Sequence, residues 1–153
     1  MTTISRLRRI HPGWILVALD VFGLAIASYL SIVELSGGVP SCGPLRGCET
    51  VAASEYAWIG PLPVAVYGTG LSLLLLVLAL AWIRTDRPAL LDLHYGLSLI
   101  GVIFEVYFLS IQVFVIGAVC IWCTLYGLSL VARFFVAMAI WLRRGRLSAR
   151  LRT

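Results

Sequence analysis

The chain has 153 residues, of which 61% are hydrophobic and only 12% are charged. Soluble proteins average roughly 45–50% apolar and 25% charged residues, so this composition excludes an ordinary soluble domain and indicates a protein of the lipid bilayer. The net charge of +5 comes from arginines that flank apolar runs. Because no basic face is interleaved with aromatic residues, we expect no nucleic-acid partner.

Four apolar segments are long enough to cross a membrane, which takes roughly 17–25 helical residues. We predict spans at residues 14–33, 62–83, 91–116 and 119–142. They leave little chain for anything else, so we expect one domain over residues 1–153. The predicted fold is an all-α bundle of four transmembrane helices, with one long outer loop that carries a short surface helix.

The arginines predict the orientation of these spans. Ten of the twelve precede the first span, separate the second from the third, or follow the fourth. By the positive-inside rule these regions are cytoplasmic, and so are both termini. The alternative, a cleaved signal peptide ending near residues 25–27, is disfavoured because apolarity continues to Val33. We expect a multi-pass protein of the inner (cytoplasmic) membrane, with its cysteines facing the periplasm or exterior.

Ionisable residues deep inside the spans need partners, because unpaired charges are costly in lipid. Counting the helical rise from the outer ends places Asp20, Glu105 and Arg133 at a common depth of roughly 20 Å. We predict a structural charge cluster in which Arg133 pairs with Glu105, Asp20 or both; a proton relay is the second interpretation. His11 and His94 fall near the cytoplasmic side and are interpreted as interfacial residues.

The outer loop carries the first cysteine pair. Glycine and proline lie between Cys42 and Cys48, and they let the chain fold back so that a small, exposed disulfide can close. Taken alone, such a pair more often forms a permanent structural disulfide than a catalytic one. A short surface helix is predicted over residues 49–58, and Pro61 and Pro63 are expected in the first turn of the second span.

The second pair, Cys120-Ile121-Trp122-Cys123, opens the last span. Thiols three residues apart share one helix face, and Gly117 is expected to break the preceding helix. The pair should then lie in a first helical turn, where the dipole favours thiolate and makes Cys120 a nucleophile. Two buried structural thiols, or half of a zinc site, are the alternatives.

A set of polar side chains is predicted at the depth of Cys123, roughly 7–12 Å below the outer ends. Together they could hydrogen-bond the carbonyl groups of a flat, lipid-soluble ligand. Singly, each could equally meet lipid headgroups or a neighbouring helix. The candidate ligand-binding residues are Tyr29, Tyr67, Gln112, Thr124 and Tyr126.

Four outward cysteines can relay electrons by thiol–disulfide exchange, and no nucleotide, flavin or metal motif is visible to remove the electrons. The ordered pattern resembles the vitamin K epoxide reductase family in its small bacterial form. The resemblance rests on Cys48-x-x-Val51-x-x-Ser54, a Pro63-to-Gly68 helix start and the Cys120–Cys123 motif. Ser28-Tyr29-Leu30 in the first span adds to it, and the similarity covers roughly residues 14–142.

The resemblance implies roles for these positions. Cys42 would meet a reduced thioredoxin-like protein, and Cys48 would pass electrons to Cys120 through a transient disulfide. Cys123 would stand beside a quinone, Ser54 would shape the loop, and Tyr126 matches the tyrosine that follows the motif in animal members. No thioredoxin-like domain follows the last span in this sequence, so a separate soluble partner is expected.

The electron acceptor implied is an ordinary membrane quinone, ubiquinone or menaquinone, with no metal. The chain has no asparagine, so an animal-type pocket contact is missing and vitamin K epoxide is disfavoured. The function predicted is thus a quinone-dependent thiol oxidase that supports disulfide formation in exported proteins. A second disulfide-generating membrane family carries its cysteine pairs in the opposite order. The non-enzymatic alternative is a structural module in which four thiolates hold zinc.

Overall fold

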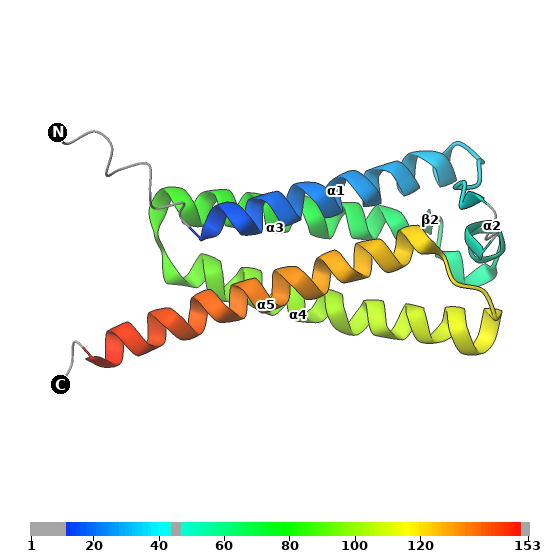
Figure 1. Ribbon diagram of the computed structural model, residues 1–153. Coiled ribbons are helices and arrows are strands. Elements are labelled where there is room, and N and C mark those ends of the chain that lie inside the picture. The colour runs from blue at the N-terminus through cyan, green and yellow to red at the C-terminus, as the bar shows by residue number, and fades with distance from the viewer. Residues whose placement is uncertain (1–11, 44–46, 151–153) are drawn as a thin grey trace.

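The structure is a computed structural model that describes residues 12–43 and 47–150. Four long helices dominate it: α1 (Gly13–Leu35), α3 (Val64–Thr85), α4 (Pro88–Ile111) and α5 (Ile121–Arg150). Each contains a stretch long and apolar enough to cross a membrane. The predicted four-span helical bundle is therefore confirmed (Figure 1).

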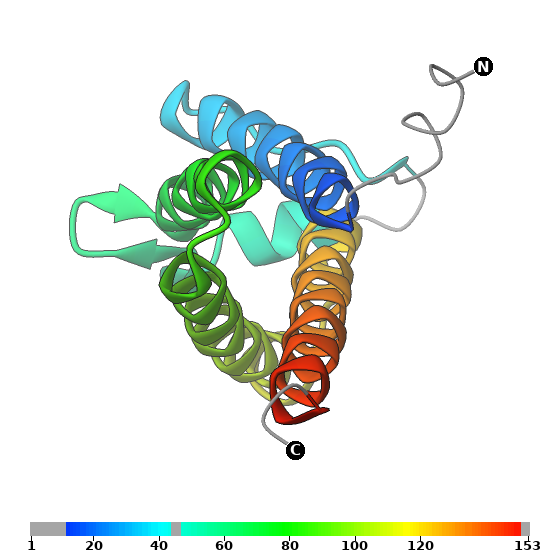
Figure 2. The same ribbon diagram turned by 90° about the vertical axis from the view of Figure 1, so that its left-hand side faces the viewer.

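The helices form a four-cornered bundle in which α1 and α4 each pack against both α3 and α5 (Figure 2). Figure 1 shows the start of α1, the α3–α4 connection and the end of α5 at one end, called here the arginine end. The opposite end, called here the cysteine end, carries α2 (Gly47–Ala52) and the link at residues 117–120. Both cysteine pairs thus lie at the same end of the bundle.

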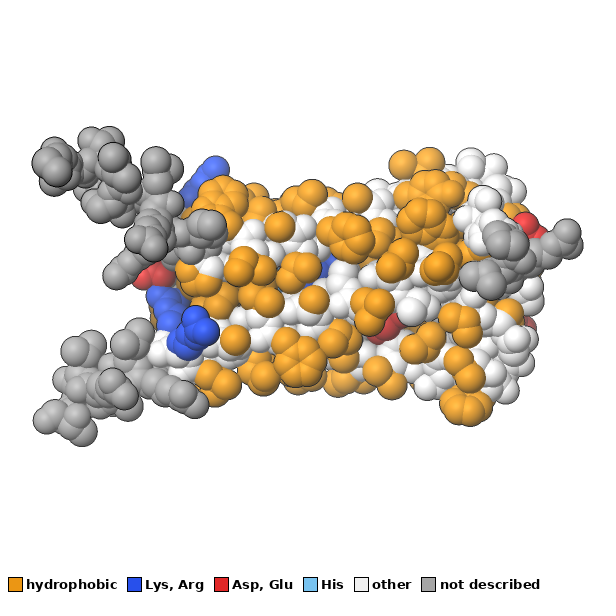
Figure 3. Space-filling model, viewed as in Figure 1, with side chains coloured by type: hydrophobic (Ala, Val, Ile, Leu, Met, Phe, Trp, Pro, Cys, Tyr) orange, Lys and Arg blue, Asp and Glu red, His pale blue; other side chains and the backbone are white. Residues whose placement is uncertain are grey.

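The sides of the bundle are apolar. Hydrophobic side chains cover the face shown in Figure 3, and blue arginine atoms gather at the arginine end. Large side chains such as Ile32, Ile103 and Leu128 are 60–68% exposed. A membrane accommodates such a surface, because lipid tails are as apolar as these side chains.

The cysteine end is closed by a small cap of short elements. After α2 come the 3₁₀ turn η2 (Glu55–Ala57), then β1 (Trp58–Ile59) and β2 (Leu62–Pro63), which pair antiparallel with Trp58 opposite Pro63. The predicted surface helix over residues 49–58 is therefore only partly right. The Ser54 hydroxyl donates to the Val51 carbonyl at 2.6 Å, and such a local bond competes with the continuation of a helix.

The second span begins later than expected. Pro63 lies in β2 with extended backbone and occupies the N-cap of α3, so neither predicted proline is in the first turn. At the other side of the bundle, α4 continues into the π-helical turn η3 (Gln112–Ile116). Gly117 ends this turn with a φ of 70°, a left-handed conformation that suits glycine. The predicted helix break at Gly117 is therefore present.

The arginine half of the bundle holds a packed core. Buried apolar side chains from all four helices meet there: Leu16, Ala79, Trp82, Leu91, Ala137 and Ile140. Beside them, Arg133 and Asp20 are fully buried, with Nε 3.6 Å from Oδ1. Asp20 also contacts Nε2 of His94 at 3.1 Å.

Two expectations about this cluster need correction. His94 is 1% exposed and hydrogen-bonded to Asp20, so it is a buried partner of the cluster and not an interfacial residue. Among the described residues, no ion pair joins Glu105 to Arg133. Arg133 instead donates to the hydroxyls of Ser72 and Ser129. Equal depth along two helices did not place the two side chains on facing sides.

Candidate redox site

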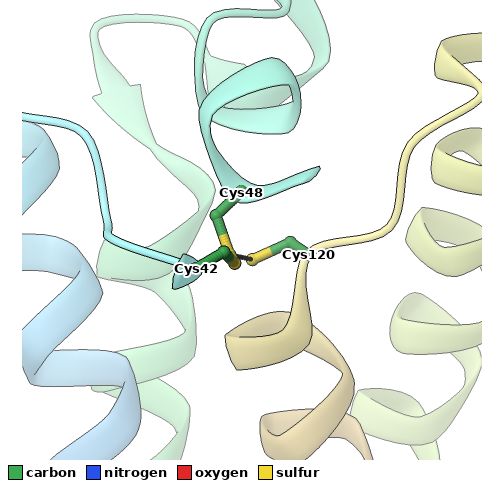
Figure 4. Close-up of side chains that lie close together, drawn as sticks. All are labelled: Cys42, Cys48 and Cys120. Carbon is green, nitrogen blue, oxygen red and sulfur yellow. Dashed lines mark hydrogen bonds between the residues drawn. A yellow bond between two sulfur atoms is a disulfide. The ribbon is translucent and has the colours of Figure 1, made fainter. Parts of the chain in front are cut away.

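Three of the four cysteines converge between α2 and α5 (Figure 4). Cys42 and Cys48 form a disulfide with their Cα atoms 5.6 Å apart. Cys120 is a free thiol, and its Sγ lies 3.3 Å from the Sγ of Cys48. Cys48 and Cys120 are both buried, whereas Cys42 is half-buried. The more accessible sulfur of the disulfide is thus Cys42, and the sulfur facing the last span is Cys48.

A glycine brings α2 this close to the link before α5. A Cβ atom on Gly47 would lie 3.0 Å from the carbonyl carbon of Val119. Because this neighbour is backbone, it has no rotamer with which to move away, and a larger residue would push the two segments apart. Cys48 follows Gly47 directly, so the backbone contact sets the distance between the Cys48 and Cys120 sulfurs.

Cys120 occupies the position just before α5, one residue outside the predicted first turn. Its N–H donates to Oε1 of Gln112 at 2.8 Å, and the N–H of Cys123 donates to its sulfur at 3.4 Å. The hydrogen bond from the Cys123 side chain lowers the pKa of Cys120 to about 7, assisted by the backbone N–H groups of Cys123 and Trp122 and opposed by burial. A substantial thiolate fraction near neutral pH makes Cys120 a nucleophile.

Cys123 faces a different environment. It lies on the wall of a cavity of about 550 Å³ in the cysteine half of the bundle. Helices α1, α3, α4 and α5 form the walls, and residues 51–59 of the cap close the top. This volume and mostly apolar lining are typical of sites for small organic molecules.

The predicted ligand-binding residues divide into two groups. Tyr67, Gln112 and Tyr126 line the cavity together with Cys123. Tyr29 instead packs on the ring of Trp122, with 5.0 Å between centroids, and is absent from the cavity wall. Thr124 hydrogen-bonds the carbonyl of Cys120 and lines a separate groove beside α2. Counting residues along a helix gives the depth of a side chain in the membrane but not its direction around the helix axis. This explains why Tyr29 and Thr124 are at the predicted depth but not on the cavity wall.

The remaining predicted residue, Ser54, also lines the cavity, at the point where α2 ends. Tyr126 is held at the wall by its hydroxyl, which donates to the Gly68 carbonyl at 3.0 Å and lies 3.2 Å from Oγ of Ser72. Gly68 therefore gives the tyrosine both its space and its acceptor.

Two carboxyl groups on the cavity wall were not predicted as part of the site. Glu34 ends α1, where the sequence analysis placed the start of the loop. Glu105 lies on α4, where it was assigned to the charge cluster with Arg133. The signal that could have separated Glu105 from that cluster is the number of acids: one arginine faced two carboxylates, Asp20 and Glu105, at the same predicted depth.

The arrangement of sulfurs favours redox chemistry over metal binding. The Sγ atoms of Cys42, Cys48 and Cys120 lie within 4.8 Å of one another, close enough to hold an ion. Zinc binds thiolates, however, and two of these sulfurs are joined in a disulfide. In this state the cluster can exchange disulfides, because a free thiol faces a disulfide sulfur.

Four helices able to cross a membrane carry a disulfide and two free thiols at one end, an arrangement suited to thiol–disulfide exchange. The sequence model of the vitamin K epoxide reductase family matches residues 14–138, which is most of the chain. The chain therefore belongs to the vitamin K epoxide reductase family, and the resemblance seen in its motifs is confirmed. No curated protein matches the chain at a significant level of similarity.

Proposed function

We propose that this protein oxidises a soluble dithiol protein on the outer side of the inner membrane and delivers the electrons to a membrane quinone. The observation that carries the proposal is the continuous path at the cysteine end. A half-exposed Cys42 leads to Cys48, which lies 3.3 Å from Cys120. Cys123 then faces the apolar cavity.

The outer steps are two disulfide transfers, and each consists of an attack and a resolution. A thiolate of the partner attacks Cys42 and breaks the Cys42–Cys48 bond, and the partner's second thiol resolves the mixed disulfide. Cys48 then attacks Cys120 of an oxidised Cys120–Cys123 pair, leaving Cys123 as the thiolate. Cys42 resolves the Cys48–Cys120 bond, so the outer disulfide forms again and the inner pair holds two electrons.

The structure has this last arrangement, with Cys42 bonded to Cys48 and the inner pair as free thiols. The cavity fits a quinone ring, because it is mostly apolar and offers polar groups from Tyr67 and Gln112. A bound quinone supplies an acceptor of two electrons and two protons. Oxidation of the Cys120 and Cys123 thiols to a disulfide releases that number of each, so the cycle balances.

The partner and membrane follow from the same features. The only half-exposed sulfur of the outer pair belongs to Cys42, which suits attack by a protein with an exposed redox dithiol, such as a thioredoxin-like protein. The arginine-rich end marks the cytoplasmic side by the positive-inside rule, which places the cysteines in the periplasm or exterior. Disulfides persist there.

The test is anaerobic reduction of soluble ubiquinone and menaquinone analogues by the purified protein, with a reduced thioredoxin-like protein as donor. Cys123→Ala should abolish turnover, because the Cys120–Cys123 disulfide cannot form. Cys120 can still attack Cys48 and release Cys42 as a thiol, so a Cys48–Cys120 disulfide is the adduct expected in this variant. Ser110→Ala, an exposed change on α4, is the control and should keep full turnover.

Two results would contradict the proposal. Turnover that survives in Cys123→Ala would show that the electrons leave by another path. A folded wild-type protein that reduces neither quinone and contains one zinc ion per chain would establish the metal-binding module instead. Dominance of a Cys42–Cys120 adduct would reverse the roles assigned to the two loop cysteines.

A further inference from the structure

Glu105 of α4 lies on the cavity wall, and it contacts α5 one helical turn along from Cys123. Its side chain packs against Gly127 of α5, where a Cβ atom would come within 2.6 Å of the Glu105 Cδ. Gly127 follows Cys123 by four residues, so the two share a helix face. The carboxyl group therefore occupies the same side of α5 as the Cys123 thiol, and both residues line the same cavity.

Packing does not account for this carboxyl group. Its Oε1 is buried and has no hydrogen-bond partner among the described residues. The arginine of the spans is occupied elsewhere, by Asp20, Ser72 and Ser129. A buried polar atom without a partner costs free energy, so a residue that served only to stabilise the bundle would be better replaced by an apolar one.

The other polar groups near Cys123 are less suited to carry a proton. The Tyr126 hydroxyl already donates to the Gly68 carbonyl. The amide side chain of Gln112 has no acidic proton to transfer, and its Oε1 accepts a hydrogen bond from the Cys120 N–H. Glu34 is half-buried at the outer end of α1, and its oxygens are not among the buried atoms that lack a partner. Of the described acids on the wall, Glu105 is the one with a buried oxygen that has no partner and is free to bond a ligand.

We propose that Glu105 is the proton-transfer residue of the membrane redox site, accepting the proton of the Cys123 thiol and giving it to the reduced acceptor in the cavity. The inference rests on the proposed function. Formation of the Cys120–Cys123 disulfide breaks two S–H bonds and releases two electrons and two protons. The electrons go to the quinone, and the proton of Cys123 passes to it through the carboxyl group. Water at the cysteine end takes the proton of Cys120 and supplies the second proton of the reduced quinone, and Glu105 ends the cycle in its starting protonation state.

The test compares Glu105→Gln and Glu105→Asp with Asp92→Asn, which neutralises an exposed acid near the start of the same helix, as the matched control. Glutamine keeps the size and hydrogen-bonding capacity of the residue but cannot transfer a proton. Quinone reduction should fall about a hundredfold in Glu105→Gln, the usual contribution of a positioned acid–base group. It should recover in part in Glu105→Asp and stay within twofold in Asp92→Asn.

Two further readouts separate proton transfer from a structural role. Alkylation of Cys120 and trapping of the Cys48–Cys120 disulfide should be unchanged in Glu105→Gln, since these steps do not use the carboxyl group. The infrared difference spectrum between dithiol and disulfide forms should contain a carboxyl carbonyl band that disappears in Glu105→Gln and persists in Asp92→Asn. This band needs no quinone, because chemical reductants and oxidants can cycle the inner pair.

The inference is overturned if Glu105→Gln keeps turnover within twofold of wild type, or if no carbonyl band is lost in that variant. If wild type itself reduces no quinone, the proposed function fails, and the infrared comparison alone then decides on Glu105. If Glu105→Gln lowers the folded yield, Glu105→Asp is compared with wild type instead. Its rate of quinone reduction should be intermediate, and its carboxyl carbonyl band in the infrared spectrum should be shifted.

Discussion

The two halves of the bundle treat their polar groups in opposite ways. In the arginine half, Asp20 is bracketed by Arg133 and His94, and all three side chains are at most 1% exposed. In the cysteine half, Glu105 has a buried oxygen without a partner, and a free thiol faces a disulfide. Partnered charges fix a scaffold, whereas groups left without partners remain available for chemistry.

The halves are nevertheless connected through hydrogen bonds. Arg133 donates to Oγ of Ser72 at 3.3 Å, and Ser72 lies 3.2 Å from the Tyr126 hydroxyl on the cavity wall. The charge cluster therefore ends on a residue of the proposed quinone site. We infer that its contribution to function is to orient Tyr126, and that its main contribution is to stability.

The largest effect is expected from Arg133→Leu, which breaks the arginine half. Asp20 would keep a buried charge without its cation, and breaking such a pair costs about 3–5 kcal/mol. We expect a strongly reduced folded yield and a lower unfolding midpoint in detergent, measured by size exclusion and thermal unfolding. Arg143→Leu, an exposed arginine on the same helix, should leave both unchanged; equal midpoints for the two variants would contradict the scaffold role.

Gly23→Ala tests the same cluster by volume alone. A Cβ atom on Gly23 would lie 2.6 Å from the guanidinium carbon of Arg133, so Arg133 must move away from Asp20. Overpacking of this kind costs about 1–3 kcal/mol, and thermal unfolding measures it. Gly70→Ala on α3 meets nothing within 4 Å and should be neutral or stabilising, so similar losses in both variants would point to a general intolerance of alanine.

In the cysteine half, Cys123→Ala should change the reactivity of Cys120. Removing the side-chain donor raises the pKa of Cys120 from about 7 toward its ordinary value of 9.0. Since only thiolate reacts, the rising limb of the pH profile shifts upward and the alkylation rate at pH 7 falls about tenfold for each unit of that shift.

This rate is measured with iodoacetamide and peptide mass spectrometry in a Cys42→Ser/Cys48→Ser background, from pH 5 to pH 10. Cys123→Ser keeps a hydrogen-bond donor and should retain most of the low pKa. A profile that is identical in the alanine variant would show that the backbone N–H groups alone set the pKa of Cys120.

The smallest effect is expected from Trp122→Phe. The indole N–H donates to the carbonyl of Ser41 at 3.0 Å and so ties the start of α5 to the segment that carries Cys42. Loss of one such bond costs about 0.5–1.5 kcal/mol, which should slow exchange between the two cysteine pairs a few-fold in stopped-flow measurements. Trp58→Phe in the exposed hairpin is the control. An equal slowing in that variant would show that the hydrogen bond from Trp122 to Ser41 does not set the exchange rate.

The sequence predicts the parts of this protein that depend on runs and spacing. Apolar length located the four spans, and the break at Gly117 placed Cys120 within one residue of its helix. The predictions failed where direction around a helix axis decides the outcome. Tyr29 and Thr124 are not part of the cavity wall, and His94, not Glu105, joins Asp20 and Arg133 in the buried cluster, because helix rotation is set by packing among all four helices.

The absence of a side chain at Gly47 affects the rate at which Cys48 and Cys120 can react. Because the backbone of α2 touches the link before α5, Cys48 and Cys120 meet without a diffusional search. Well-oriented intramolecular pairs react as if one partner were present at an effective molarity of about 10⁵–10⁸ M. In the proposed reaction, transfer between the two pairs is then a first-order process whose rate is independent of protein concentration. The proposal therefore predicts that turnover at low partner concentration is limited by the encounter with the soluble dithiol.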